Sequence, residues 1–265
     1  MNKYDKVIER VFFNNYREGD IRVAFNREEL ADACEQLKIK RIKNLGDIPY
    51  TYRFRRELPQ SLTDKLNDDS DWIIIGTGVG NYEFRQAQPG KINPSENRQR
   101  IKILDATPEI VKCYAPGTDE QALLAKVRYN RLIDIFTGLT CYSIQNHLRT
   151  SIANVGQIEI DEIYLGVNKR GAHFAIPCQA KSPGDRFGIV QVMQDIEFCK
   201  IRYPNVLCKP IALQFLTEND VAILELSVDE EDRMLRLSVV DEKHYKLVPK
   251  NGITESEIKQ ICERE

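Results

Sequence analysis

The sequence predicts an α/β (α+β) protein in which a mixed sheet is flanked by helices. Two observations support this fold class. Segments with the two-residue alternation of strands follow one another from residue 156 to residue 248, and a helical segment over 186–202 interrupts them. The stretch 172–216 therefore has a β–α–β order, which is typical of two parallel strands joined by a right-handed crossover.

The composition is that of a globular protein with a substantial core. Of 265 residues, 42% are hydrophobic and 29% are charged, and no apolar run approaches the ~20 residues that span a bilayer. The N-terminus has scattered charges and no small-residue cleavage site, so we expect neither a signal peptide nor a membrane partner. Seven cysteines without a CxxC pair favour reduced thiols in the cytoplasm and make zinc binding an unfavoured interpretation.

Residues 1–90 are expected to form a small N-terminal α+β domain that recognises DNA. The segment 3–13 predicts a helix. A second helix is expected to follow Asn26, because Asn26 and Glu29 have the spacing of a capping box and apolar residues recur behind them at helical intervals.

A strand and a hairpin are expected to complete this domain. Aromatic and basic residues alternate over 50–56 and predict a strand that presents arginines on one side. The run over 72–84 predicts a hairpin whose glycine-rich turn, at 76–80, lacks the lysine of a phosphate loop. Short helices, a basic strand and a hairpin are compatible with a winged-helix-like module.

Positive charge is concentrated in this domain, although the whole chain has a net charge of −2. Residues 38–56 carry seven Lys and Arg against one Asp, with tyrosines and a phenylalanine between them. Such a stretch is suited to the phosphate backbone of DNA, and a solvated basic face is the alternative interpretation. Four cations are our candidates for DNA contacts: Lys43, Arg53, Arg55 and Arg56.

The polar segment 86–100, broken by Pro and Gly, is expected to be a linker, so residues 101–265 form the second domain. Helical periodicity predicts one helix over 117–136, capped at Thr118 or Asp119, and another over 140–153. The other elements expected are strands over 156–167, 172–181, 208–216 and 221–228, the helix over 186–202, and a strand pair over 234–248 whose part 241–249 forms an edge.

Two neighbouring strands of the second domain carry polar side chains at matching positions. Strand alternation puts Glu159 and Asp161 on one face, and it puts Gln179 and Lys181 on one face of the next strand. Paired as a hairpin, the strands would bring these four side chains together. Carboxylate and amide oxygens suit Mg²⁺, and a lysine beside them can activate a water or stabilise charge on a phosphoryl group.

This pattern resembles the PD-(D/E)XK nuclease superfamily, and in particular its Gln-x-Lys branch, which is similar to Mrr-type restriction enzymes. Asp161 matches the aspartate of that motif, and Gln179-Ala180-Lys181 matches its second half. In element order the resemblance covers roughly residues 118–216, and it implies a restriction-endonuclease-like fold. It also implies Mg²⁺ as the cofactor and hydrolysis of double-stranded DNA by a homodimer, leaving a 5′-phosphate.

One departure from the superfamily concerns Gln179, which stands where an acid is usual. The neutral amide removes a negative charge from the metal site, so tight metal binding needs a further acid. Glu159, Glu162 and Glu120, which lies on an earlier helix, are candidates, and Glu159 is preferred to Glu120. We therefore expect Asp161, Gln179 and Glu159 to bind the metal and, together with Lys181, to be catalytic.

The expected function is a Mg²⁺-dependent DNA endonuclease of the restriction type in the cytoplasm. A first alternative is a structure-specific repair nuclease or junction resolvase, which would prefer branched DNA to a defined sequence. A second alternative is a non-catalytic DNA-binding regulator, which would bind DNA with little dependence on Mg²⁺ and leave it intact.

Overall fold

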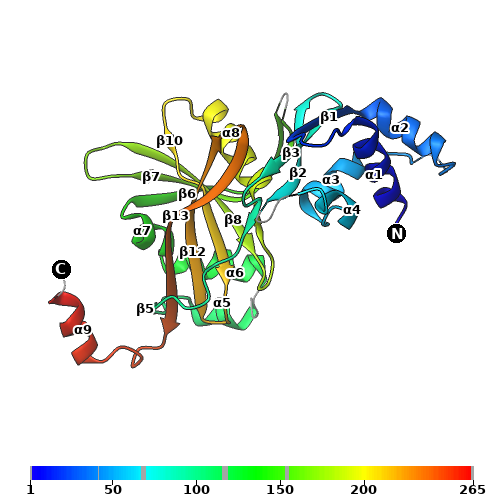
Figure 1. Ribbon diagram of the computed structural model, residues 1–265. Helices are drawn as coiled ribbons and strands as arrows, with labels where there is room; N and C mark the ends of the chain where they lie inside the picture. Colours follow the sequence, from blue (N-terminus) through cyan, green and yellow to red (C-terminus); the bar gives the residue numbers. More distant parts are fainter. Residues whose placement is uncertain (1, 41, 67–69, 115–118, 153–154, 264–265) are drawn as a thin grey trace.

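A large mixed sheet organises the chain in the computed structural model, which describes residues 2–40, 42–66, 70–114, 119–152 and 155–263. Its strands are β1 (Arg22–Asn26), β2 (Asp71–Gly78), β3 (Asn81–Ala87), β5 (Arg100–Leu104), β6 (Thr140–Ile152), β7 (Gly156–Val167), β8 (His173–Lys181), β10 (Leu207–Cys208), β11 (Ile211–Phe215), β12 (Asp220–Glu231) and β13 (Met234–Val248). Over these ranges the main order is β1-β3-β13-β12-β11-β8-β7-β6 (Figure 1), with β2 beside β3, β5 beside β13 and β10 beside β8. A separate ladder pairs β4 (Lys91–Ile92) with β9 (Phe187–Gly188).

Helices pack on both faces of the C-terminal part of this sheet, so the predicted mixed sheet flanked by helices is confirmed. The helices are α1 (Lys3–Asn15), α2 (Arg27–Gln36), α3 (Asp47–Phe54), α4 (Gln60–Thr63), α5 (Glu109–Tyr114), α6 (Glu120–Tyr129), α7 (Leu132–Thr137), α8 (Ile189–Arg202) and α9 (Glu255–Cys262). In β8, Ile176 and Cys178 lie in the core with α6 and α7, whereas Ala175 packs with Phe198 and Cys199 of α8. None of the described helices is long and apolar enough to cross a membrane.

The strand–helix–strand crossover predicted for residues 172–216 is present. β8 and β11 are parallel neighbours, paired from Ile211 opposite Cys178 to Gln214 opposite Lys181, and α8 connects them. Because neighbouring parallel strands run in the same direction, this crossover places the C-terminal end of β8 beside the C-terminal end of β11. The candidate functional residues lie near these C-terminal ends.

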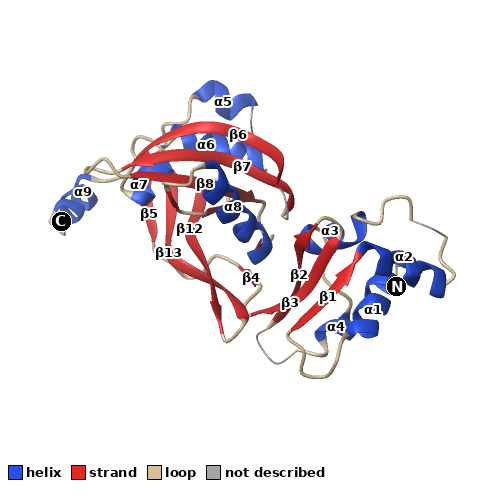
Figure 2. Cartoon of the chain, turned by 90° about the horizontal axis from the view of Figure 1, so that it is seen from above, coloured by secondary structure: helices blue, strands red, loops and turns tan. Residues whose placement is uncertain are grey.

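The N-terminal elements form their own core against β1–β3. α1–α4 lie beside this antiparallel ribbon at one end of the molecule (Figure 2). The predicted capping box at the start of α2 is confirmed: Asn26 Oδ1 accepts hydrogen bonds from the Glu28 and Glu29 amides, and Glu29 Oε2 accepts one from the Asn26 amide at 2.7 Å. The predicted hairpin is also confirmed, as β2 and β3.

The segment predicted as a linker, 86–100, contains the last residues of β3, all of β4 and the first residue of β5. The N-terminal ribbon meets the larger sheet there, where Ala87 of β3 pairs in parallel with Leu235 of β13. Ile73 and Ala87 also share a hydrophobic cluster with residues of β12, β13 and α8.

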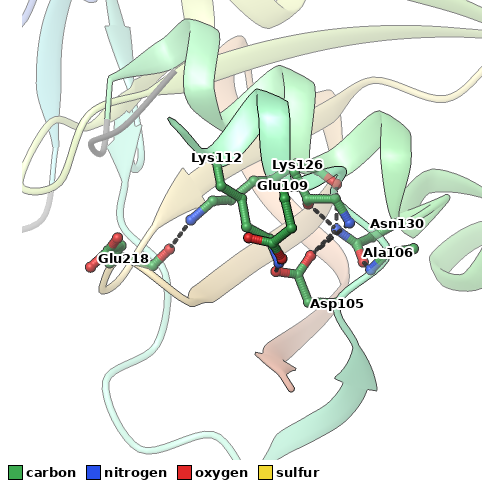
Figure 3. A network of polar contacts seen from close by, with 8 residues as sticks. Asp105, Ala106, Glu109, Lys112, Lys126, Asn130 and Glu218 are labelled. Carbon is green, nitrogen blue, oxygen red and sulfur yellow. Dashed lines mark hydrogen bonds and ion pairs between the residues drawn. The ribbon is translucent and has the colours of Figure 1, made fainter. Parts of the chain in front are cut away.

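A polar network around Asp105 holds α6 in place (Figure 3). Asp105 accepts hydrogen bonds from the Thr107 amide at 2.9 Å and from Asn130 Nδ2 at 3.2 Å, and it forms an ion pair with Lys112 at 3.1 Å. Asn130 stands between α6 and α7 and also accepts a hydrogen bond from the Ala106 amide at 2.7 Å. The segment after β5 is thereby joined to the C-terminal end of α6, whose other end reaches the candidate site.

The strand predicted over 50–56 is wrong, because these residues belong to the helix α3 and the turn after it. The helix buries Ile48 and Tyr52 on one side, and the Tyr52 hydroxyl donates a hydrogen bond of 2.6 Å to Asp5 of α1. This tertiary burial outweighs the local alternation of aromatic and basic residues. As a result, the arginines lie at the C-terminal end of a helix rather than along a strand.

The helix predicted over 140–153 is also wrong, because described residues 140–152 form β6. This strand pairs antiparallel with β7 from Thr140 opposite Val167 to Ile152 opposite Gly156, and its register shifts between Ser143 and Gln145. The shift explains the apolar spacing that mimicked a helix. The antiparallel ladder with the next strand, β7, decides the structure of this segment.

The single helix predicted over 117–136 is divided into α6 and α7, because Arg131 adopts a left-handed conformation with φ of 51°. Of the two predicted caps, Asp119 is confirmed and accepts a hydrogen bond from the Ala122 amide at 2.8 Å, whereas Thr118 lies outside the described residues. The pair of strands predicted over 234–248 is one strand, β13. Its segment 241–248 is no edge, because it pairs with β12 on one side and β5 on the other.

Candidate functional site

Three of the predicted site residues meet where β7 and β8 separate. The two strands pair antiparallel up to Glu162 opposite Cys178, as the hairpin prediction required. Beyond that pair, a side chain continues the connection: Asp161 Oδ2 accepts a hydrogen bond of 2.8 Å from the Ala180 amide. Asp161 is therefore held against the strand that carries Gln179 and Lys181.

The amide of Gln179 has a defined orientation. Its Nε2 donates to the Glu159 carbonyl oxygen at 3.0 Å and faces both carboxylate oxygens of Asp195, at 3.0 and 3.1 Å. A peptide carbonyl only accepts hydrogen bonds, so the NH₂ group must face it and Oε1 must point the other way. Within the described ranges, Oε1 receives no donor and is not sealed off from solvent, so it is free to accept a ligand.

Asp195 is the buried residue behind this amide. It lies on α8 with only 1% of its surface exposed, and burial raises the pKa of Asp195 well above its ordinary value although the hydrogen bond from Gln179 lowers it. The sequence contains a signal for this role. Asp195 falls at helical spacing with Val192, Phe198 and Cys199, so an acid occupies a core-facing position that is normally apolar.

Glu120 is a second acid in electrostatic contact with Asp161, in addition to Glu159, whose negative charge also contributes to raising the pKa of Asp161. Glu120 begins α6, and burial raises its pKa, with the negative charge of Asp161 as the next contribution and Lys181 opposing it. Burial likewise raises the pKa of Asp161, while the Ala180 amide and then Lys181 lower it. Asp185, in the loop after β8, also contributes to raising the pKa of Glu120.

The remaining acids considered from the sequence point elsewhere. Glu159 is exposed, and its carboxylate lies 3.5 Å from Arg149 of β6. Glu162 is fully buried and binds Arg128 of α6 at 3.0 Å and the Ser143 hydroxyl. Because adjacent strand residues face opposite sides, Glu162 lies on the face opposite Asp161. The main chain of Glu159 takes part in the site through the carbonyl that orients Gln179, and its carboxylate contributes to raising the pKa of Asp161.

Metal donors at the site are mixed in kind. Across the described ranges, no three His, Cys, Asp or Glu side chains are grouped as a metal site. The available oxygens are Asp161 Oδ1 and Gln179 Oε1, and the acids whose charge acts on Asp161 or is acted on by it are Glu120 and Glu159. Mg²⁺ commonly takes one or two carboxylates and keeps several waters, so this donor set fits Mg²⁺ better than a metal that needs a full set of protein ligands.

The loop that carries Asp185 is fixed from behind. Gln214 of β11 is buried and donates through Nε2 to the carbonyl oxygens of Ser182 and Asp185, at 2.7 and 2.8 Å. Gln214 pairs in register with Lys181 in the parallel ladder. The sheet thus sets the position of the loop immediately after the lysine.

A cleft of about 350 Å³ adjoins the site and is lined by both parts of the chain. Lys181, Asp185 and Gln191 contribute from the C-terminal part, and residues 52–57 contribute from α3 and the turn after it. Six cationic and two acidic side chains line this cleft, although the chain as a whole is slightly acidic. The cleft is therefore a local positive region suited to an anion.

Three of the four predicted DNA contacts line this cleft: Arg53, Arg55 and Arg56. In the described part of the chain, Arg53 and Arg55 form no ion pair, and Arg53 Nε is buried without a hydrogen-bond partner. Arg53 and Arg55 instead lie over the rings of Phe54 and Tyr50, at 4.9 and 5.0 Å. Lys43, the fourth, is exposed and lies outside the cleft lining.

Comparison of the chain with protein-family models, with curated proteins and with solved structures gave no match.

Proposed function

We propose that this protein is a Mg²⁺-dependent DNA endonuclease of the restriction type, related to the Gln-x-Lys branch of the PD-(D/E)XK nucleases. One observation carries the proposal: Lys181 and the three arginines at the end of α3 line the same cleft. The sequence indicates phosphoryl chemistry for the lysine and DNA contacts for the arginines. These residues come from segments more than 120 residues apart in the sequence. The order of the longer elements, α7-β6-β7-β8-α8-β11, with the two-residue strands β9 before α8 and β10 after it, is compatible with the same family.

In the proposed mechanism, Asp161 and Gln179 would hold the metal ion through a carboxylate and an amide oxygen, and Glu120 would take the place expected for Glu159. The bound Mg²⁺ would supply Lewis-acid stabilisation of the scissile phosphate. Lys181 lines the cleft, where its side-chain nitrogen orients the attacking water and stabilises charge that develops on the phosphoryl oxygens. Arg55 and Arg56 bind neighbouring phosphates of the same strand and thereby position the scissile bond.

The activity test uses supercoiled plasmid and Mg²⁺ with wild-type protein, Asp161→Ala and Lys181→Ala. Lys169→Ala is the matched control, because Lys169 is an exposed lysine in the turn at the other end of the same hairpin. We expect nicked or linear DNA with a 5′-phosphate from wild type and from Lys169→Ala, and none from the two site variants. Cleavage by either site variant at the wild-type rate would refute the site assignment.

The two alternative functions predict different outcomes when branched DNA is added as a substrate and binding to duplex DNA is measured. A junction resolvase or repair nuclease would cut branched DNA and leave linear duplexes of any sequence intact. A DNA-binding regulator would bind duplex DNA equally well with and without Mg²⁺ and would not cut it. The proposal also includes a homodimer acting on cytoplasmic double-stranded DNA, and sedimentation of the protein with a single-site duplex tests the dimer directly.

A further inference from the structure

A carboxylate lies between two cations at the wall of the cleft. Glu57 Oε2 is 2.6 Å from Lys91 Nζ, and Glu57 Oε1 is 2.8 Å from Arg186 Nη2. All three side chains belong to the lining that also includes Lys181. Neither Lys91 nor Arg186 was among the cations selected from the sequence.

The two cations are placed together by the backbone. Lys91 belongs to β4, Arg186 immediately precedes β9, and these short strands pair antiparallel with Lys91 opposite Gly188. Glu57 comes from a third segment, the turn after α3. The pair of cations is therefore part of the fold, and the carboxylate reaches it from outside.

The geometry of this contact is that of a phosphate-binding site. Each of the two carboxylate oxygens accepts a hydrogen bond from a different cation, as the two non-bridging oxygens of a phosphodiester would. Burial acts to raise the pKa of Glu57, but hydrogen bonds from Lys91 and Arg186 hold it below its ordinary value, so the group is charged at neutral pH. The side chain of Glu57 is 66% exposed, so it can leave the cations without disturbing the core.

We propose that Lys91 and Arg186 form a binding site for a backbone phosphate of the DNA strand, and that Glu57 occupies this site in the free protein. DNA then displaces Glu57 when it enters the cleft. This inference rests on the proposed function, because it takes DNA as the ligand. It adds two cations to the DNA path and makes Glu57 a built-in competitor that weakens binding of short or poorly fitting duplexes.

The test measures binding of a fluorescent DNA duplex to the full chain in EDTA, where cleavage cannot interfere. Glu57→Gln keeps the shape of the side chain and removes its charge. We expect its Kd to be about 3- to 10-fold lower than that of wild type at low salt, because two cations become available to phosphate. We expect the slope of log K against log salt to steepen by about one to two.

The molecule provides a matched control in Glu230. This residue also bridges two cations, Arg22 and Arg85, each at 2.6 Å, and its side chain is 46% exposed. It lies outside the cleft lining, so Glu230→Gln makes the same change in net charge without opening the proposed site. Its Kd for DNA should stay within about twofold of the wild-type value.

A second pair of variants assigns the gain to the two cations. Adding Lys91→Gln or Arg186→Gln to Glu57→Gln should abolish the gain in affinity, while thermal melting verifies that each variant is folded. The inference would be overturned if Glu57→Gln bound DNA no more tightly than wild type or than Glu230→Gln. Weaker binding than wild type would indicate that Glu57 only joins the three segments. Failure of wild type to bind any duplex would overturn the proposed function as well, so the two failures are distinguishable.

Discussion

Gln179 and Asp195 form a buried amide–carboxyl pair, in which Gln179 Nε2 faces the two carboxyl oxygens of Asp195 at 3.0 and 3.1 Å. The same nitrogen donates to the Glu159 carbonyl oxygen at 3.0 Å. Position 179 therefore needs a hydrogen-bond donor on one side and an oxygen on the other, and glutamine supplies both. An acid at this position, as is usual in the superfamily that the motif resembles, would supply only the oxygen.

This pairing predicts that Gln179→Glu harms the protein, although it restores the more common metal-binding residue. Two carboxyl groups would meet in a buried site, and the Glu159 carbonyl would lose its donor, so we expect a loss of about 2 kcal/mol in the free energy of unfolding. Urea denaturation in EDTA measures this loss without reference to catalysis. An unchanged unfolding midpoint would show that Asp195 does not constrain position 179.

The reciprocal change supplies the control. Asp195→Asn provides an amide that can donate to the carboxylate introduced by Gln179→Glu, so the double variant should recover most of the stability lost in the single variant. A double-mutant cycle gives the coupling between the two positions. Additive effects would contradict a direct interaction.

Glu120→Gln is expected to weaken the dependence on Mg²⁺ without unfolding the protein. Because Glu120 and Asp161 interact electrostatically beside Lys181, loss of the Glu120 charge should raise the Mg²⁺ concentration at half-maximal cleavage by about 10-fold. Glu159→Gln is the comparison, since that carboxylate is exposed, lies near Arg149 and makes only a minor contribution at Asp161, and it should change the same value by less than about twofold. The reverse order of effects would make Glu159, and not Glu120, the acid that assists Asp161.

Substitution of the arginines in the cleft should weaken DNA binding in a salt-dependent way. Arg55→Gln and Arg56→Gln should each raise the Kd for a duplex about 3- to 10-fold and reduce the salt slope by about one, as expected for a lost phosphate contact. Lys43→Gln removes one charge outside the cleft and should have little effect. Fluorescence anisotropy over a range of NaCl concentrations makes the comparison, and equal effects of all three changes would mean that the cleft is not the DNA path.

Asp105→Asn should destabilise the protein at neutral pH but not in acid. Burial acts to raise the pKa of Asp105, but hydrogen bonds from Thr107, Lys112 and Asn130 lower it from 3.8 to about 2. A lowered carboxyl pKa stabilises the fold above the unfolded value, and this contribution is lost as the pH falls through the folded value. We expect the variant to lose about 2 kcal/mol at pH 7 and the difference from wild type to shrink from about pH 5 to pH 2.

The control for this prediction is Glu109→Gln, because Glu109 shares Lys112 with Asp105 but its side chain is 87% exposed. Urea denaturation at a series of pH values should show no pH-dependent difference for this variant. An Asp105→Asn difference that stays constant down to pH 2 would mean that the charge of Asp105 does not stabilise the network.

Much of the C-terminal part could be predicted from the sequence alone. β7, β8 and α8 have periodicities that agree with their final burial, so local pattern and tertiary structure point the same way. The meeting of Asp161 with Gln179 and Lys181 follows from this, since two strands joined by a short turn pair as a hairpin. The capping box of Asn26 and Glu29 was equally predictable, because its four atoms belong to residues that are close together in the chain.

Two segments were predicted wrongly because contacts with other elements outweigh their local pattern. Residues 50–56 become helical because Tyr52 is buried against α1, and residues 140–152 become a strand because β7 offers a ladder along their whole length. The electrostatic contact of Glu120 with Asp161 and the cleft shared by Lys181 and the arginines also depend on packing between separate elements. The sequence by itself determined the reactive groups and their local strands, since strand period is a property of neighbouring residues. Only the tertiary structure decided which acids and cations lie near those groups and how the Gln179 amide is oriented. The reason is that sheet register and burial set contacts between residues of separate elements.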